Sequence, residues 1–251
     1  MQYMLATLAE RPELEDQVAT LYRAMLPVIG VRDASEDRYQ ETLFCCFPEY
    51  QLMFYDEQDQ VVAFGNAIPT TWDGTVSGLS EGWDVAYEHS ISEHACQRQP
   101  TTLLALGVGV KPALRGRAIS GQVLQAMRQL ALTHKLLDII APVRPTFKCR
   151  YPLIAMEDYA SWTRQDGLPF DPWIRVHARL GARILKIAPR STIVTGTVQE
   201  WERWAGMPLP HSGSYILPEA LVPITISCER NEGRYEEPNV WMQHPLTQNG
   251  D

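Results

Sequence analysis

The sequence lacks any apolar run long enough to span a membrane, and its N-terminus lacks the pattern of a secretory signal peptide. Its five cysteines are an odd number with no Cys-x-x-Cys spacing, which argues against a disulfide framework or a zinc site. Positive charge is in deficit, since 22 Lys and Arg oppose 30 Asp and Glu for a net charge of −8. This balance argues against nucleic-acid and anionic-membrane partners, which require a basic face. We therefore expect a cytoplasmic protein.

The sequence also lacks internal repeats, low-complexity segments and recognisable linkers. Its apolar and charged fractions are those of an ordinary globular protein. A chain of 251 residues has room for an ample core, and we expect one domain over residues 1–251.

The clearest periodic pattern lies in residues 103–135. Between residues 103 and 110, bulky apolar residues alternate with alanine or glycine, which predicts a strand with one core-facing side and one nearly bare side. Glycine weakens a strand, so the bare side indicates a place where backbone or ligand comes close. Apolar residues recur at helical spacing over residues 123–131, which predicts that a helix follows.

The turn between this strand and this helix carries three cations, Lys111, Arg115 and Arg117, together with Gly116 and Gly121. A helix N-terminus offers unpaired backbone N–H groups and a partial positive charge, and both favour phosphate. The sequence thus predicts a phosphate site at this turn. An ordinary connection with solvated basic residues is the alternative.

The pattern Val110-x-Pro112-x-x-Arg115-Gly116-x-x-Ile119 resembles the acyl-CoA-binding motif of the GNAT superfamily. The resemblance implies that backbone amides of the loop bind the CoA pyrophosphate. The CoA-binding residues that it implies are Val108, Val110, Arg115, Gly116, Arg117, Ala118, Ile119, Ser120 and Gly121. Ala118 stands where the family prefers glycine, so a positive φ at that position would be costly.

A further apolar stretch over residues 136–143 predicts a second strand, parallel to the first and joined to it by the helix. The resemblance implies an α/β fold with a central, mixed and twisted sheet flanked by helices. In this GNAT fold the two parallel strands splay apart, and the pantetheine arm of acyl-CoA lies between them. The first CoA motif then covers residues 103–135.

Residues 144–173 form an insertion that small members of the superfamily lack. Its proline-bounded turns and many aromatic residues predict a structured segment packed over the site.

Residues 174–188 resemble the second CoA motif, which is a helix ending in a glycine, here Gly181. The family commonly has a tyrosine four residues before this glycine, and it protonates the departing CoA thiolate. His177 occupies that position. Histidine titrates near pH 6.5, so His177 is expected to protonate the thiolate, or to polarise a thioester carbonyl and protonate an enolate. A satisfied core histidine is the alternative.

Weaker patterns cover the rest of the chain. They predict helices over residues 12–25 and 35–44, strands over 50–55, 60–68 and 221–227, and a capping box from Thr197 to Glu200. Residues 70–99 are expected to form a long loop with one short helix. The acidic and histidine side chains of that loop are expected to be solvated rather than to bind metal. Residues 236–244 show no chemistry beyond aromatic packing.

The preferred function is that of an acyl-CoA-using enzyme acting on a short acyl thioester. Residues 100–245 resemble the large GNAT-like domains that begin some bacterial polyketide assembly lines. Those domains decarboxylate malonyl-type thioesters with a threonine, a histidine and an arginine, which implies Thr146, His177 and Arg190 here. The resemblance also implies transfer of an acyl group to an acyl carrier protein, which would then be a partner of the chain.

Two alternatives remain. An ordinary N-acetyltransferase would move the acetyl group of acetyl-CoA to a small-molecule amine, with Glu81 or Glu157 as the candidate base. A non-catalytic acyl-CoA-binding module is the other. None of these functions requires a metal or a cofactor beyond acetyl-CoA or malonyl-CoA.

Overall fold

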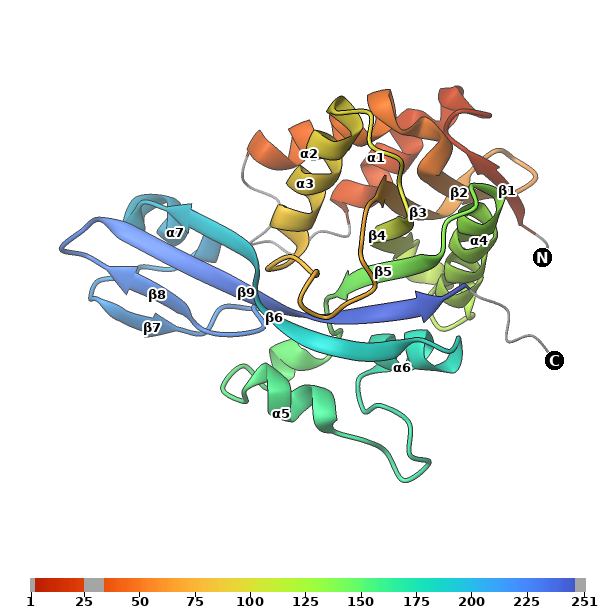
Figure 1. The fold of residues 1–251 in the computed structure, drawn as a ribbon. Coiled ribbons are helices and arrows are strands. Elements are labelled where there is room, and N and C mark those ends of the chain that lie inside the picture. Colours follow the sequence, from red (N-terminus) through yellow and green to blue (C-terminus); the bar gives the residue numbers. More distant parts are fainter. Residues whose placement is uncertain (1–2, 25–33, 247–251) are drawn as a thin grey trace.

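A computed structural model describes residues 3–24 and 34–246, which form a mixed nine-stranded sheet with helices packed against it (Figure 1). The strands are β1 (Met4–Thr7), β2 (Gln51–Tyr55), β3 (Val61–Thr70), β4 (Thr102–Val110), β5 (Asp138–Val143), β6 (Arg183–Gly196), β7 (Gly213–Tyr215), β8 (Ile224–Ser227) and β9 (Glu232–Pro245). The helices are α1 (Glu15–Arg23), α2 (Ala34–Cys46), α3 (Trp83–Ala95), α4 (Ile119–Thr133), α5 (Met156–Ser161), α6 (Pro172–Arg179) and α7 (Val198–Ala205). The predicted α/β class and mixed sheet are confirmed.

Strands β4 and β5 are parallel, but they pair at only three register positions, from Thr102↔Asp138 to Leu104↔Ile140. Beyond these positions, β4 continues beside β3 and β5 continues beside β9, each to its own end. The two parallel strands therefore diverge, as the family resemblance implies.

A β-bulge interrupts β4 at Leu106. Gly107 pairs with Asn66 and Ala105 pairs with Ala67, so Leu106 has no partner on β3. The strict alternation expected over residues 103–110 is therefore wrong at this point. The bulge leaves the Leu106 carbonyl without a strand partner, and it accepts a hydrogen bond from the Trp83 indole (3.0 Å).

Successive residues of β3 show which helices cover which face of the sheet. A Cβ atom added to Gly65 would lie 2.6 Å from a methyl carbon of Val123, so α4 packs closely on this face. Phe64 points to the opposite face, where its ring centre lies 5.8 Å from that of Tyr22 on α1. Helices α4 and α1 thus lie on opposite faces of β3.

The long loop predicted for residues 70–99 is wrong in part, because β3 extends to Thr70 and α3 is 13 residues long. Glu93 of α3 is buried and accepts hydrogen bonds from the Thr70 hydroxyl (3.0 Å) and the Thr71 N–H (2.7 Å). These bonds place α3 on the same face as the Thr70 side chain. Within the described residues, no group of three or more metal-ligating side chains is found.

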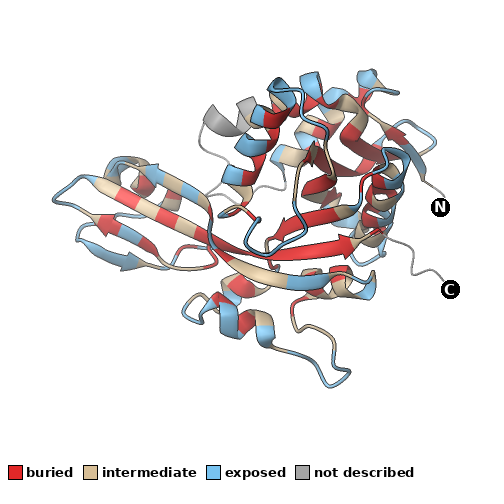
Figure 2. Cartoon of the chain, viewed as in Figure 1, coloured by how far each residue is buried: buried red, intermediate tan, exposed pale blue. Residues whose placement is uncertain are grey.

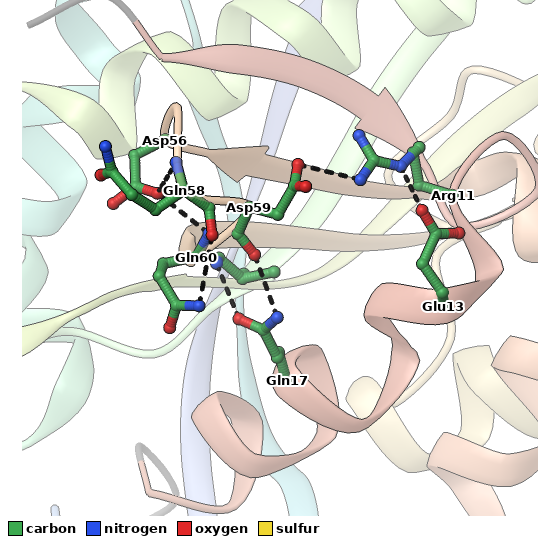
Figure 3. A network of polar contacts seen from close by, with 8 residues as sticks. Arg11, Glu13, Gln17, Asp56, Gln58, Asp59 and Gln60 are labelled. Carbon is green, nitrogen blue, oxygen red and sulfur yellow. Dashed lines mark hydrogen bonds and ion pairs between the residues drawn. The ribbon is translucent and has the colours of Figure 1, made fainter.

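Hydrogen bonds connect the N-terminal segment to the turn of the β2–β3 hairpin (Figure 3). Arg11 donates to the Asp59 carboxylate (2.9 Å), and the Gln17 amide donates to the Asp59 carbonyl (3.0 Å). Gln17 also accepts from the Val61 N–H (3.0 Å), so α1 is held along the sheet. The helix expected over residues 12–25 begins as a 3-10 turn and ends at Arg23, and residue 25 lies outside the described residues.

The C-terminal part of the chain contains the long strands β6 and β9, each 14 residues, which the sequence patterns did not predict. Strand β9 pairs with β6 along one edge, and with β5 and β8 along the other. Figure 2 shows buried residues along the central strands and exposed residues on the outer faces of the helices. The predicted capping box is present, with Thr197 and Glu200 each bonding the other's backbone N–H. None of the described helices is long and apolar enough to cross a bilayer.

Candidate functional site

The loop that follows β4 has the backbone of an anion site. Gly116 (φ +81°) and Ala118 (φ 59°) take left-handed conformations, and α4 begins immediately afterwards. These two turns leave the backbone N–H groups of residues 116–120 without an acceptor among the described residues. Lys111, Arg115 and Arg117 likewise have no carboxylate partner in the part of the chain that the structure describes. The loop therefore combines free donors, three cations and a helix N-terminus.

Helix α6 is positioned by the buried carboxylate of Asp171, which is 2% exposed. One oxygen accepts from two N–H groups in the first turn of α6 and from the Thr146 N–H (3.2 Å). The other accepts from the Phe147 N–H (2.8 Å) and the Tyr159 hydroxyl (2.7 Å). Asp171 thus joins three parts of the chain through hydrogen bonds, namely α6, the segment after β5, and α5.

His177 lies in the last turn of α6 and is 2% exposed. Its Nδ1 is 2.8 Å from Nε2 of His244 on β9, and its Nε2 is buried with no hydrogen-bond partner. Burial, and then the nearby His244, hold the pKa of His177 well below its usual value. Burial, together with the charge of Arg128, lowers the pKa of His244 to about 4. Both rings are therefore neutral at neutral pH.

The two rings share one hydrogen, carried either by Nδ1 of His177 or by Nε2 of His244, and the tautomer decides which ring donates. The free Nε2 of His177 is an acceptor in the first case and a donor in the second.

The other predicted site residues have different surroundings. Thr146 is exposed and is linked to α6 through its backbone bond to Asp171. Arg190 lies on β6 and forms an exposed ion pair with Glu81 (3.3 Å). Among the described residues, no recorded contact joins Arg190 to Thr146 or to His177. The structure therefore links Thr146 to the helix of His177 and leaves Arg190 in a separate pair.

Glu157, the other candidate base, lines a cavity of about 450 Å³ beneath β6 and β9. Glu236, Arg230 and Arg234 also line this cavity, and Arg234 forms an ion pair with Glu236 (2.8 Å). The cavity walls therefore carry charges of both signs.

Sequence reasoning missed two residues that organise this region, Asp171 and His244. A local signal for Asp171 exists in the sequence. Aspartate is a preferred N-cap residue, and here it is followed by Pro172 at the first helical position. His244 had no local signal, because it meets His177 across 67 residues of sequence.

Comparisons with known proteins give three informative likenesses, although no family model matches the chain. The arginine N-acetyltransferase avaD of Aspergillus versicolor is 30% identical, over 97% of this chain and 94% of that protein. The GphF GNAT-like decarboxylase, solved with isobutyryl-CoA, has a TM-score of 0.61 and 17% identity, over 98% of this chain and 100% of that one.

The third likeness is to the loading GNATL domain of CurA from Lyngbya majuscula, with a TM-score of 0.57, 15% identity and 98% of each chain covered. The two solved structures are large GNAT-like domains of the kind that residues 100–245 resemble. At 15% and 17% identity, these two likenesses show the fold alone.

The loop conformation predicts an unusual pair of mutational effects. Ala118→Gly should stabilise the protein by about 1 kcal/mol, because alanine is disfavoured at φ 59°. Gly116→Ala should destabilise it by a similar amount, since an added Cβ has no neighbour within 4 Å and only the backbone strain acts. Urea unfolding of the two variants and of the wild type measures both changes in the free energy of unfolding. Equal stabilities for all three would contradict the left-handed conformations.

The buried histidine pair predicts that acid weakens the fold. In the unfolded chain both rings take up protons below about pH 6.5, whereas folded His244 resists protonation until about pH 4. Stability should therefore fall as the pH drops from 6.5 to 4, by about 3 kcal/mol for His244 alone. Denaturant unfolding at several pH values should show a shallower loss of unfolding free energy in His244→Gln, whose amide can still hydrogen-bond Nδ1 of His177. An identical pH slope in both proteins would refute the assignment.

Proposed function

This chain belongs to the GNAT superfamily of acyl-CoA N-acyltransferases, and we propose that it is an N-acetyltransferase for a small cationic amino compound of the arginine type. The observation that carries the proposal is the similarity to an arginine N-acetyltransferase over nearly the full length of both chains. The geometry described above supplies what acetyl transfer from acetyl-CoA requires, namely an anion loop and a pair of diverging strands.

In this proposal the CoA pyrophosphate binds the free N–H groups of residues 116–120, with Arg115 and Arg117 adding charge. The pantetheine arm lies between β4 and β5, where neither strand has a partner on its inner edge. What supports this path is continuity, because the loop begins where β4 ends. No cofactor besides the acyl-CoA is proposed.

The transfer itself forms one bond and breaks another. The neutral amine attacks the acetyl carbonyl carbon, the carbon–sulfur bond breaks, and the CoA thiolate takes up the proton that the nitrogen loses. We assign His177 to this end of the site, where its unpartnered Nε2 would hydrogen-bond the CoA sulfur or the pantetheine amide. In support, the neighbouring Val176 lies 3.9 Å from the Cβ position of Gly121 in the first turn of α4.

Decarboxylation of a malonyl-type thioester is the second candidate, with Thr146, His177 and Arg190 as its residues and an acyl carrier protein as the partner. The link from Thr146 to the helix of His177 through Asp171 supports it. The ion pair of Arg190 with Glu81 on the surface weighs against it, since that arginine is already neutralised. We therefore rank it below amine acetylation.

One assay separates these functions. The protein is incubated with acetyl-CoA and L-arginine, and separately with malonyl-CoA alone, and mass spectrometry follows the CoA species and the acetylated amine. We expect free CoA and acetylarginine in equal amounts. Arg115→Ala should raise the KM for acetyl-CoA about tenfold through loss of a charged phosphate contact. The exposed Arg98→Ala, far along the chain from the loop, serves as the charge-matched control.

Other outcomes assign a different function. Acetyl-CoA formed from malonyl-CoA without an amine would establish decarboxylation. Binding of acetyl-CoA with no turnover in either arm would leave a non-catalytic acyl-CoA-binding module.

A further inference from the structure

Asn66 on β3 is an unsatisfied amide in the middle of the sheet. It is 1% exposed, and neither its Oδ1 nor its Nδ2 has a hydrogen-bond partner. Burying an amide without partners costs free energy, so native proteins retain few such groups. The position of Asn66 opposite the β4 bulge gives a reason for keeping this one.

The side chain of Asn66 faces away from α4. Residues alternate along β3, so Asn66 shares the face of Phe64, which contacts α1, and not that of Gly65, which contacts α4. Thr70, on the same face, is bonded to α3. Asn66 therefore points to the side of the sheet that carries α1 and α3.

Open space lies beside Asn66 on this face. Its register partner is Gly107, and paired residues of antiparallel strands point to the same side. A Cβ atom built on Gly107 meets nothing within 4 Å. The glycine thus leaves room next to an amide that lacks both a donor and an acceptor partner.

Two neighbouring side chains, Trp83 and Gln51, are held in place by hydrogen bonds. Trp83 is held over the bulge by its hydrogen bond to the Leu106 carbonyl, and its ring stacks on Tyr87 with centres 5.5 Å apart. Gln51, the other register partner of Asn66, is held by donating to the carbonyls of Phe47 (2.9 Å) and Ala67 (2.8 Å).

The charge on this side suits a cationic acceptor. Asp84 follows Trp83 on α3 and accepts from the Ile193 N–H (3.0 Å). Burial raises the pKa of Asp84, and the neighbouring carboxylates of Glu88 and Glu237 raise it further. Glu237 is already paired with Arg144 (2.9 Å), so Asp84 and Glu88 are the carboxylates that would attract a cation here.

An acyl-CoA whose pyrophosphate lies at the start of α4 reaches this space directly. Its arm would enter on the α4 side and pass between β4 and β5, beyond their last register pair at Leu104↔Ile140. The acyl end would then emerge on the α1 and α3 side, beside Gly107 of the bulge. This placement rests on the proposed function.

We propose that Asn66 binds both reacting groups of the acyl transfer. Its Nδ2 donates to the carbonyl oxygen of the thioester, and its Oδ1 accepts from an N–H of the attacking amine. The two amide atoms stand side by side on one carbon, as the oxyanion and the attacking nitrogen do on the tetrahedral carbon. Donors placed for the developing oxyanion accelerate such reactions. Asn66 gains and loses no proton while the carbon–nitrogen bond forms and the carbon–sulfur bond breaks.

The test compares stability with catalysis in Asn66→Leu. Leucine has a similar size and removes two unsatisfied polar atoms, so the variant should be as stable as the wild type or more stable. Its kcat with acetyl-CoA and arginine should fall about 100-fold, as for loss of an oxyanion donor. The control, Gln243→Leu, removes a buried amide that is bonded to Arg183 and Asp138, and it should lower the melting temperature.

A binding readout separates this inference from the proposed function. Acetyl-CoA should raise the melting temperature of the wild type more than CoA does, because CoA lacks the carbonyl that Nδ2 binds. That difference should vanish in Asn66→Leu and also in Asn66→Asp, which keeps the size and loses the donor. If the wild type acetylates no amine, the proposed function fails, and this comparison still decides the carbonyl contact. Wild-type kcat in Asn66→Leu, or an unchanged difference between acetyl-CoA and CoA, would overturn the role of Asn66.

Discussion

The divergence of β4 from β5 is the constraint on which the rest of the site depends. The two strands share three register positions and then follow different neighbours, β3 and β9. Their inner edges consequently have no strand partner, which is where an extended arm of a ligand can lie between them. The loop that leads into α4 begins where β4 ends, so the N-terminus of α4 follows directly on this loop. The sheet pairing thus positions the loop, and in the proposed function it also positions the acyl end of the bound acyl-CoA.

Two buried polar groups without partners lie on opposite faces of the sheet. Nε2 of His177 is on the side of α4 and α6, and the amide of Asn66 is on the side of α1 and α3. Each is fixed by its neighbours, His177 by the bond to His244 and Asn66 by its place in β3. Unsatisfied groups of this kind cost stability, and functional sites are where native proteins retain them. In the proposed function they contact successive parts of one acyl-CoA.

The features that could be predicted from sequence are those with local causes. The strand, turn and helix of residues 103–135 follow from periodicity and glycine, and the capping box follows from Thr197 and Glu200. The bulge at Leu106 and the pairing of Ile139 with His244 depend on partners distant in sequence, so no local pattern indicates them. Strand β9 is buried on both faces over residues 237–244, which removes the alternation that identifies a half-buried strand.

The most direct measurement is amide hydrogen exchange with and without acetyl-CoA, resolved over the loop after β4. We predict that acetyl-CoA slows exchange of the N–H groups of residues 116–120, which have no acceptor within the described chain, and that Arg115→Ala reduces this protection. Saturation with acetyl-CoA that leaves these amides exchanging as in the free protein would contradict the placement of CoA at the start of α4.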